Sequence, residues 1–244
     1  MEKAIVITGA SSDLGMSYIA ENAVSYDRII AHYNHKSEKF EKLLNAYSNK
    51  ITAIKADFSK ETEIDSFVQE LKEEKICPTH ILHLASLPVN SERFHKIAIE
   101  EYQAMMRVSL YSIIEILKVC IPIMQKQKYG KILFLLSAYT TIPSPKFAAP
   151  YVASKYALLG LMKSVAAEYG SKGIIVNGIS PQMMETKFIK DVPELIVEKH
   201  RTASPLGRLV QKGDVLPLMR LLLSDDTIAI TGENISVGGG NYSL

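Results

Sequence analysis

Short apolar runs alternate with longer amphipathic stretches along almost the whole of this 244-residue chain. The runs expected to form strands are Lys3–Thr8, Arg28–Tyr33, Ile51–Ala56, His80–Leu84, Lys131–Leu136, Ile174–Ile179 and Glu233–Val237. The stretches expected to form helices are Leu14–Ser25, Lys39–Ser48, Glu61–Glu74, Glu100–Gln127, Tyr151–Tyr169 and Lys212–Ser224. Several runs are apolar throughout, as strands are when a parallel sheet buries them on both faces. The alternation predicts right-handed βαβ units, and therefore an α/β fold: a single doubly wound domain over residues 1–244 with a mostly parallel seven-stranded sheet.

The charge of the chain is nearly balanced, with 28 Lys and Arg against 26 Asp and Glu, and no long block carries one sign. This composition predicts no nucleic-acid partner. Cys77 and Cys120 form no motif and are too few for a disulfide framework, so we expect reduced core thiols and no metal site. A strand pattern begins at once without a signal peptide, and no apolar run approaches the length of a membrane span. We therefore expect a cytoplasmic protein with no membrane partner.

The first predicted strand runs into Thr8-Gly9-Ala10-Ser11-Ser12-Asp13-Leu14-Gly15, which then opens a helix. Glycine allows a tight turn and a close backbone approach, and the helix N-terminus offers unpaired N–H groups and a positive dipole end. At the first βα junction, this turn predicts a Rossmann-type site for a dinucleotide pyrophosphate. Asp13 is an unexpected anion there, and we interpret it as a helix N-cap that faces backbone N–H groups. Ser11 or Ser12 would donate to phosphate instead.

The second predicted strand ends at His32-Tyr33-Asn34-His35-Lys36. An NAD-selective site usually carries an acidic residue here, which holds the ribose 2′-hydroxyl. None occurs before Glu38. His35 and Lys36 are placed to face a 2′-phosphate, although the same residues would also suit a solvated turn. The pattern favours NADP(H) over NAD(H).

Tyr151 and Lys155 are spaced to lie on one face of a predicted helix, about one turn apart. A tyrosine hydroxyl is a poor acid–base group at neutral pH, because its ordinary pKa is near ~10. A neighbouring ammonium stabilises the phenolate and lowers that pKa. The pair therefore suits proton transfer between a carbonyl and an alcohol.

Further segments follow in order along the chain: Ala56-Asp57-Phe58-Ser59, Asn177-Gly178-Ile179-Ser180-Pro181 with Thr186, Pro205-Leu206-Gly207-Arg208, Thr231-Gly232-Glu233 and Gly238-Gly239. With the glycine-rich turn and the Tyr–Lys pair, they make the chain resemble the short-chain dehydrogenase/reductase family over essentially its whole length, especially its β-ketoacyl-ACP-reductase-like branch. The resemblance implies a catalytic set of Ser137, Tyr151, Lys155 and Ser109. It also implies cofactor contacts from Gly9, Ser11, Ser12, Asp13, Leu14, Gly15, Tyr33, Asn34, His35, Lys36, Asp57, Phe58, Leu84, Ala85, Ser86, Tyr151, Lys155, Pro181, Met184 and Thr186.

The chain departs from the family pattern at four places. Asp13 replaces the middle glycine of the turn, and Val237 replaces an acidic residue near the C-terminus. The family's Asn-Asn-Ala-Gly reads His83-Leu84-Ala85-Ser86 here, which we expect to remove polar support near the cofactor. Ser109 stands where the family has an asparagine that holds a proton-relay water. The Tyr–Lys pair remains, so an active enzyme is still expected.

Two ways of counting compete for the substrate-orienting serine. Thirteen residues before Tyr151 lies Ala138, whereas seven residues after Gly130, at the start of the predicted strand, lies Ser137. One residue is therefore inserted between strand and tyrosine. A buried strand cannot absorb it, because a slip of one residue turns every side chain to the opposite face, whereas a loop can. We assign the role to Ser137, the alternative being that Ser137 only caps the strand.

The expected function is carbonyl reduction with NADPH, in which Tyr151 gives a proton to the oxygen that Ser137 binds. The alternative is a catalytically decayed cofactor-binding protein that serves as a sensor or partner subunit. A sugar-nucleotide epimerase or dehydratase shares the Tyr–Lys pair but usually has a longer substrate-binding portion.

The partner is expected to be a small carbonyl or alcohol substrate. Met183, Met184 and Phe188 suggest that it has an apolar part. One interpretation of Lys126, Lys128 and Lys172 is that they contact the acidic surface of an acyl carrier to which the substrate is linked. The alternative is that they are ordinary solvated surface lysines. Residues 182–205 interrupt the alternation and are interpreted as a substrate lid or as a surface helical hairpin. The resemblance implies a homo-oligomer, a tetramer or dimer, formed through Glu100–Gln127 and Tyr151–Tyr169.

Overall fold

The computed structural model describes residues 2–190 and 192–240 and contains one seven-stranded sheet in the order β3-β2-β1-β4-β5-β6-β7. Every pair of neighbouring strands is parallel. The strands are β1 Ala4–Thr8, β2 Arg28–Tyr33, β3 Ile51–Lys55, β4 His80–His83, β5 Gly130–Leu135, β6 Ile174–Pro181 and β7 Asn234–Val237. The predicted doubly wound α/β fold is confirmed. The order reverses between β1 and β4, so a crevice for a ligand is expected at the carboxyl ends of these two strands.

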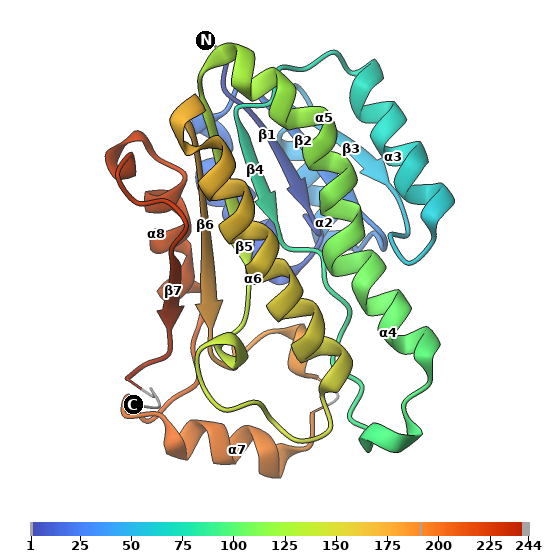
Figure 1. The fold of residues 1–244 in the computed structure, drawn as a ribbon, viewed down its shortest axis with the longest axis vertical. Coiled ribbons are helices and arrows are strands. Elements are labelled where there is room, and N and C mark those ends of the chain that lie inside the picture. The colour runs from blue at the N-terminus through green and yellow to red at the C-terminus, as the bar shows by residue number, and fades with distance from the viewer. Residues whose placement is uncertain (1, 191, 241–244) are drawn as a thin grey trace.

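Helices cover both faces of the sheet (Figure 1). They are α1 Asp13–Asn22, α2 Glu38–Ala46, α3 Glu61–Glu73, α4 Ile99–Met106, α5 Ser112–Gln127, α6 Ala149–Tyr169, α7 Glu194–Ala203 and α8 Lys212–Leu222. Short turns are η1 Ala23–Ser25, η2 Phe94–Lys96, η4 Ala138–Thr140, η5 Gly170–Lys172, η6 Lys187–Ile189 and η7 Asp225–Thr227. One apolar core lies between the sheet and α3, α5 and α6, and a second lies between the sheet and α1 and α8.

The helix Ile99–Gln127 is the longest in the described chain and contains α4, a π-helical turn η3 (Arg107–Tyr111) and α5. By length and composition it is apolar enough to cross a membrane, which contradicts the expectation that no run approaches that length. Of its most apolar window, 56% is buried inside the protein. Its apolar residues pack against β4, β5 and α6, so core packing accounts for its composition.

Candidate active site

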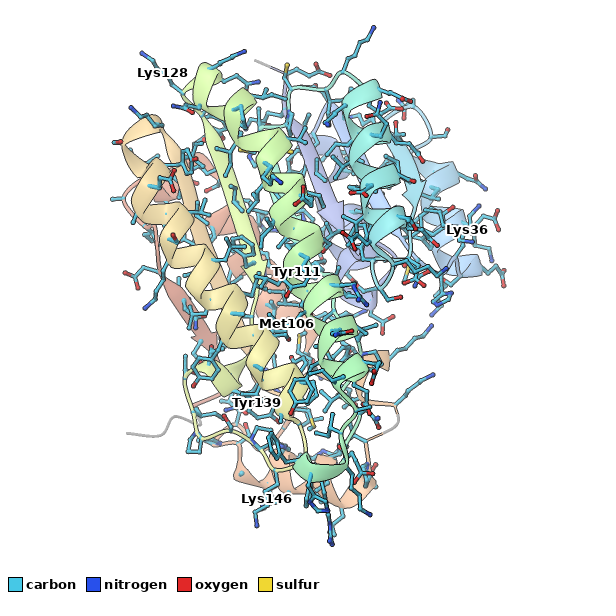
Figure 2. All side chains as sticks on the ribbon, turned by 45° about the vertical axis from the view of Figure 1, so that its right-hand side comes forward. Lys36, Met106, Tyr111, Lys128, Tyr139 and Lys146 are labelled. Atoms are coloured by element: carbon cyan, nitrogen blue, oxygen red, sulfur yellow. The ribbon has the colours of Figure 1, made fainter. Side chains whose placement is uncertain are left out.

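The carboxyl ends of β1, β4, β5 and β6 bring Thr8, His83, Leu135 and Pro181 to one edge of the sheet. Parallel strands all end at the same edge, so residues far apart in sequence meet there. Tyr139, which follows β5, marks this edge in Figure 2, and Lys128 marks the opposite end of the molecule. The residues expected to be catalytic lie around this edge.

Tyr151 and Lys155 lie together near the start of α6, as their spacing predicts. Lys155 Nζ is 5.5 Å from the centre of the Tyr151 ring and donates a hydrogen bond of 2.8 Å to the Leu135 carbonyl at the end of β5. Burial raises the pKa of Tyr151 to about 12, although a hydrogen bond with Ser137 acts in the opposite direction. Burial also lowers the pKa of Lys155 to about 8. In this state the tyrosine is protonated at neutral pH.

Ser137 lies two residues after the end of β5 and is the N-cap of the short turn η4. Its Oγ accepts a hydrogen bond of 3.3 Å from the Tyr139 N–H, which holds the start of the turn. The Ser137 side chain also forms the hydrogen bond with Tyr151 that affects the tyrosine pKa. Ala138 is 2% exposed inside the turn. Of the two candidate positions, Ser137 is the one that places a hydroxyl against Tyr151.

Ser109 is fully buried in the π-helical turn that divides α4 from α5. Such turns free backbone carbonyls from the regular helical pattern and often occur at functional sites. The Ser109 carbonyl accepts a hydrogen bond of 2.9 Å from His83 Nε2. The Ser109 hydroxyl faces the Met105 sulfur at 3.9 Å, a weak contact. The backbone at this position is therefore held by a histidine on the neighbouring strand.

His83 supplies polar support that its replacement of asparagine was expected to remove, so that expectation was wrong. Its Nδ1 lies 2.7 Å from Thr8 Oγ1, and its Nε2 bonds to Ser109. Because a carbonyl can only accept, Nε2 carries the proton and Nδ1 accepts from threonine. The contact exists because Thr8 and His83 are paired across β1 and β4. Burial lowers the pKa of His83 to about 3, so the ring stays neutral.

The glycine-rich turn has the close backbone packing that a pyrophosphate cradle needs. Gly9 has a φ of +67°, and a Cβ there would lie 3.0 Å from the Ala85 N atom. A Cβ on Gly15 would lie 2.7 Å from the Ala10 carbonyl oxygen. These positions exclude side chains and bring the N-terminus of α1 to the sheet edge. The turn therefore fits the phosphates of a dinucleotide.

Asp13 does not cap α1, contrary to the interpretation from the sequence. Ser12 is the N-cap, and its Oγ accepts a hydrogen bond of 3.1 Å from the Gly15 N–H. Asp13 is the next residue, and its Oδ2 accepts a hydrogen bond of 2.8 Å from the Lys187 N–H. The Asp13 carboxylate therefore bonds to the segment after β6 and not to the backbone of α1.

The segment after β6 contacts both the glycine-rich turn and the catalytic candidate Tyr151. Lys187 is bonded to the cradle through Asp13, and the Phe188 ring lies 6.1 Å from the Tyr151 ring. Met184 forms an isolated parallel bridge with Val210. Residues 182–205 contain η6 and α7, and Asp191 within them lies outside the described residues. This segment therefore lies beside both the glycine-rich turn and Tyr151, where a substrate lid would lie.

The residues expected to select the cofactor lie at the end of β2 and after β3. His35 and Lys36 are exposed, and Lys36 Nζ forms an ion pair of 2.9 Å with Glu41 that raises the lysine pKa. Asp57 Oδ1 accepts hydrogen bonds of 3.0 and 2.7 Å from the Ser59 N–H and hydroxyl. Phe58 is buried, so its ring packs in the core rather than facing a ligand.

His32 is a residue that the sequence analysis did not assign. Its Nδ1 accepts a hydrogen bond of 3.0 Å from the Gly9 N–H, and its Nε2 donates one of 3.0 Å to the Ala56 carbonyl. Its ring stacks on Phe58 at 3.6 Å, with an angle of 1° between the planes. The histidine thus ties the cradle to the end of β3. A polar residue inside an apolar strand run was the signal that could have identified it.

The lysines expected to contact an acyl carrier do not lie beside Tyr151. Lys128 ends α5 and Lys172 lies in η5, next to the starts of β5 and β6. The 21 residues of α6 separate this end from the site, about 30 Å of helix. Figure 2 shows Lys128 at the far end of the molecule from Tyr139. Within the described ranges, no group of three or more His, Cys, Asp or Glu side chains is arranged to hold a metal ion.

Comparison with known proteins gives matches over nearly the whole chain. A family model described as enoyl-(acyl carrier protein) reductase matches residues 18–241. The 3-oxoacyl-[acyl-carrier-protein] reductase of Staphylococcus aureus (strain Mu50 / ATCC 700699) is 26% identical over 245 residues, which cover 99% of each chain. The D-beta-hydroxybutyrate dehydrogenase of Rhizobium meliloti (strain 1021) is 25% identical over 256 residues, which cover 98% of each chain.

Solved structures share the fold. A 3-oxoacyl-[acyl-carrier protein] reductase from Brucella melitensis ATCC 23457 has a TM-score of 0.87 at 23% identity, and the match covers 100% of this chain and 92% of the other. Levodione reductase has a TM-score of 0.87 at 21% identity, with 98% and 96% covered. The names of these proteins differ in substrate, so the likeness concerns architecture.

Proposed function

Because this chain belongs to the short-chain dehydrogenase/reductase family of oxidoreductases, we propose that it interconverts a carbonyl and a secondary alcohol with NADP(H), acting as a reductase. The observation that carries the proposal is the contact of Tyr151 with both Lys155 and Ser137, beside the glycine cradle. The test mixes the protein with NADPH or NADH and a carbonyl panel that includes a 3-oxoacyl thioester, and follows nicotinamide absorbance. Cofactor binding without turnover of any carbonyl would favour the decayed cofactor-binding alternative.

Each residue of the proposed site has a separate task. Gly9, Gly15 and the N-terminus of α1 would hold the pyrophosphate, and the bound reduced nicotinamide supplies a hydride with its two electrons. Ser137 would donate a hydrogen bond to the substrate carbonyl oxygen. Tyr151 would give that oxygen its proton, which is later replaced from solvent. The high pKa of Tyr151 keeps the hydroxyl protonated until charge develops on the substrate oxygen.

Lys155 is proposed to bind the nicotinamide ribose hydroxyls and to stabilise the Tyr151 phenolate. Its hydrogen bond to the Leu135 carbonyl fixes the ammonium beside the tyrosine ring. A cation at this position lowers the cost of the phenolate that remains after proton transfer. Ser109 would act only by holding the backbone of the π-helical turn, because its carbonyl is bonded to His83 and its hydroxyl faces the Met105 sulfur.

The proposed preference for NADP(H) predicts a specific effect of Lys36→Glu. Wild-type protein should bind NADPH more tightly than NADH, and Lys36→Glu should reduce the ratio by about tenfold, because a carboxylate repels a 2′-phosphate. Fluorescence titration with both cofactors measures the ratio. Lys39→Glu is the matched control, because Lys39 lies on the exposed surface of the following helix. Tighter binding of NADH by the wild type would refute the preference.

We further propose that residues 182–205 form a substrate lid on a single domain that spans residues 1–244, of which Met1, Asp191 and 241–244 lie outside the described residues. Two contacts support a lid: the Lys187 N–H bonds to Asp13, and Phe188 lies against Tyr151. Asp13 then has two effects, one on the cofactor and one on the lid. Its charge opposes the pyrophosphate, and its hydrogen bond holds the lid at the cradle.

Two variants separate these effects of Asp13. Asp13→Gly and Asp13→Asn should each tighten cofactor binding by about tenfold, because both remove a negative charge beside the phosphates. Only Asp13→Gly should speed proteolytic cleavage within residues 182–205 in cofactor-free protein, since the asparagine oxygen still accepts from Lys187. Asp65→Asn, at an exposed position on α3, controls for the loss of one charge. Equal cleavage of the wild type and the glycine variant would argue against the lid.

Small carbonyl compounds are the proposed substrates, and the position of Lys128 and Lys172 gives no support to acyl-carrier docking on the same copy. We propose a homodimer or homotetramer formed through α4, α5 and α6. Two tyrosines support this interface: Tyr111, in the η3 turn between α4 and α5, and Tyr156, on α6, are each 48% exposed. The cytoplasmic location stays a prediction.

A further inference from the structure

A cavity of about 140 Å³ opens beside Tyr151, on the side formed by α4 and the loop after β4. Leu87 and Pro88 line it from the loop, Met105 lines it from α4, and Pro150 lines it from the start of α6. Figures 1 and 2 show α4 alongside the start of α6 at this end of the molecule. A cavity of about this volume elsewhere accommodates benzene, so a six-membered ring fits.

The wall of the cavity is held in place by contacts that need no ligand. The Glu92 N–H donates a hydrogen bond of 3.2 Å to the Phe147 carbonyl, which joins the loop after β4 to the loop before α6. On the inner side, Met105 is 5% exposed and Ala148 is 4% exposed. The cavity is therefore a preformed part of the fold.

Glu101 gives the cavity a chemical preference. Among the described residues that line the cavity, it is the one ionisable residue besides Tyr151. Its Oε2 accepts a hydrogen bond of 2.9 Å from Asn90 Nδ2, and in the described chain Oε1 takes no hydrogen bond. Glu101 lies in the first turn of α4, where the helix dipole favours an anion. The exposed Arg93 and Lys96 lie near η2 and do not line the cavity.

We propose that this cavity selects the substrate, and that it accepts a compact, uncharged ring ketone that carries a hydroxyl group away from the carbonyl. The inference rests on the proposed function, since the carbonyl must reach Tyr151. Apolar walls take the ring, and Glu101 Oε1 accepts from the hydroxyl. A carboxylate at the same end of the ring meets the Glu101 carboxylate in a partly desolvated site and is rejected.

The test uses three cyclohexanones that carry a hydroxyl, a hydrogen or a carboxylate opposite the carbonyl. In wild-type protein, kcat/KM should fall in that order, with the carboxylate about tenfold or more below the hydroxyl compound. Glu101→Gln should raise kcat/KM for the carboxylate about tenfold relative to the hydroxyl compound, because the amide oxygen still accepts but the charge is gone. Glu100→Gln is the matched control, since Glu100 is exposed and does not line the cavity, and it should leave the order unchanged.

A second measurement tests ligand binding in the cavity independently of catalysis. Saturation-transfer NMR follows binding of the same three compounds, and Ala104→Leu, which fills the cavity from α4, should weaken all three. If no ring is reduced while the binding order and the Ala104→Leu effect hold, the proposed function fails and the pocket assignment stands. If the ratio of kcat/KM between the carboxylate and the hydroxyl compound is the same in wild type and Glu101→Gln, or if Ala104→Leu binds the three compounds as well as the wild type does, the pocket assignment is overturned. Absence of both reduction and binding also overturns it.

Discussion

Tyr151→Phe is expected to remove carbonyl reduction almost completely while leaving cofactor affinity nearly unchanged. General acid catalysis contributes roughly a hundred- to ten-thousandfold to rate, and in the proposed mechanism the tyrosine hydroxyl is the only proton donor to the substrate oxygen. Phenylalanine keeps the ring that contacts Tyr139 and Phe188. Initial rates measure the loss of turnover, and fluorescence titration with NADPH measures the affinity.

Tyr156→Phe is the matched control for this variant. Tyr156 lies on the same helix but is 48% exposed, so its hydroxyl should have no part in turnover. A Tyr151→Phe protein that turns over within a factor of two of the wild type would contradict the mechanism. A protein that loses turnover and cofactor binding together would show instead that the tyrosine hydroxyl holds the dinucleotide.

The sheet was predictable because a parallel strand is buried on both faces and therefore stands out in the sequence as a short, uninterrupted run of apolar residues. The predicted run Ile51–Ala56 corresponds to β3, Ile51–Lys55, and the other strands agree comparably well. The helix α7 was foreseen only as part of the alternative of a surface helical hairpin at residues 182–205, without bounds of its own. Val197 is its one buried residue, and Leu195 is 81% exposed, so no apolar stripe marks it in the sequence.

The contacts that depend on register or on distant segments could not be read from the sequence. His83 supports the site because it is paired with Thr8 across β1 and β4, and asparagine at the same position would reach less far. Asp13 bonds to a residue 174 positions away. Local pattern made Asp13 look like a cap, because an aspartate at the start of a helix usually has that role.

Ser137→Ala should lower turnover by about ten- to a hundredfold, because a hydrogen bond to an oxygen that gains charge contributes roughly 1.5–3 kcal/mol. Replacement of the rival residue, Ala138, by serine should change turnover little. Ala138 is 2% exposed in the η4 turn, and Ala138→Ser would place a hydroxyl in that buried turn rather than beside Tyr151. The decisive measurement is kcat/KM for both variants, with thermal unfolding to show that each is folded.

The pair of variants also tests the register argument. The extra residue between strand and tyrosine must lie in the loop, because β5 pairs with β4 and β6 on its two sides and cannot slip alone. Ser137 then keeps the position that follows the strand, where its hydroxyl contacts Tyr151. If Ala138→Ser raised turnover sharply while Ser137→Ala had no effect, the insertion would lie before Ser137 and the assignment of the serine would be wrong.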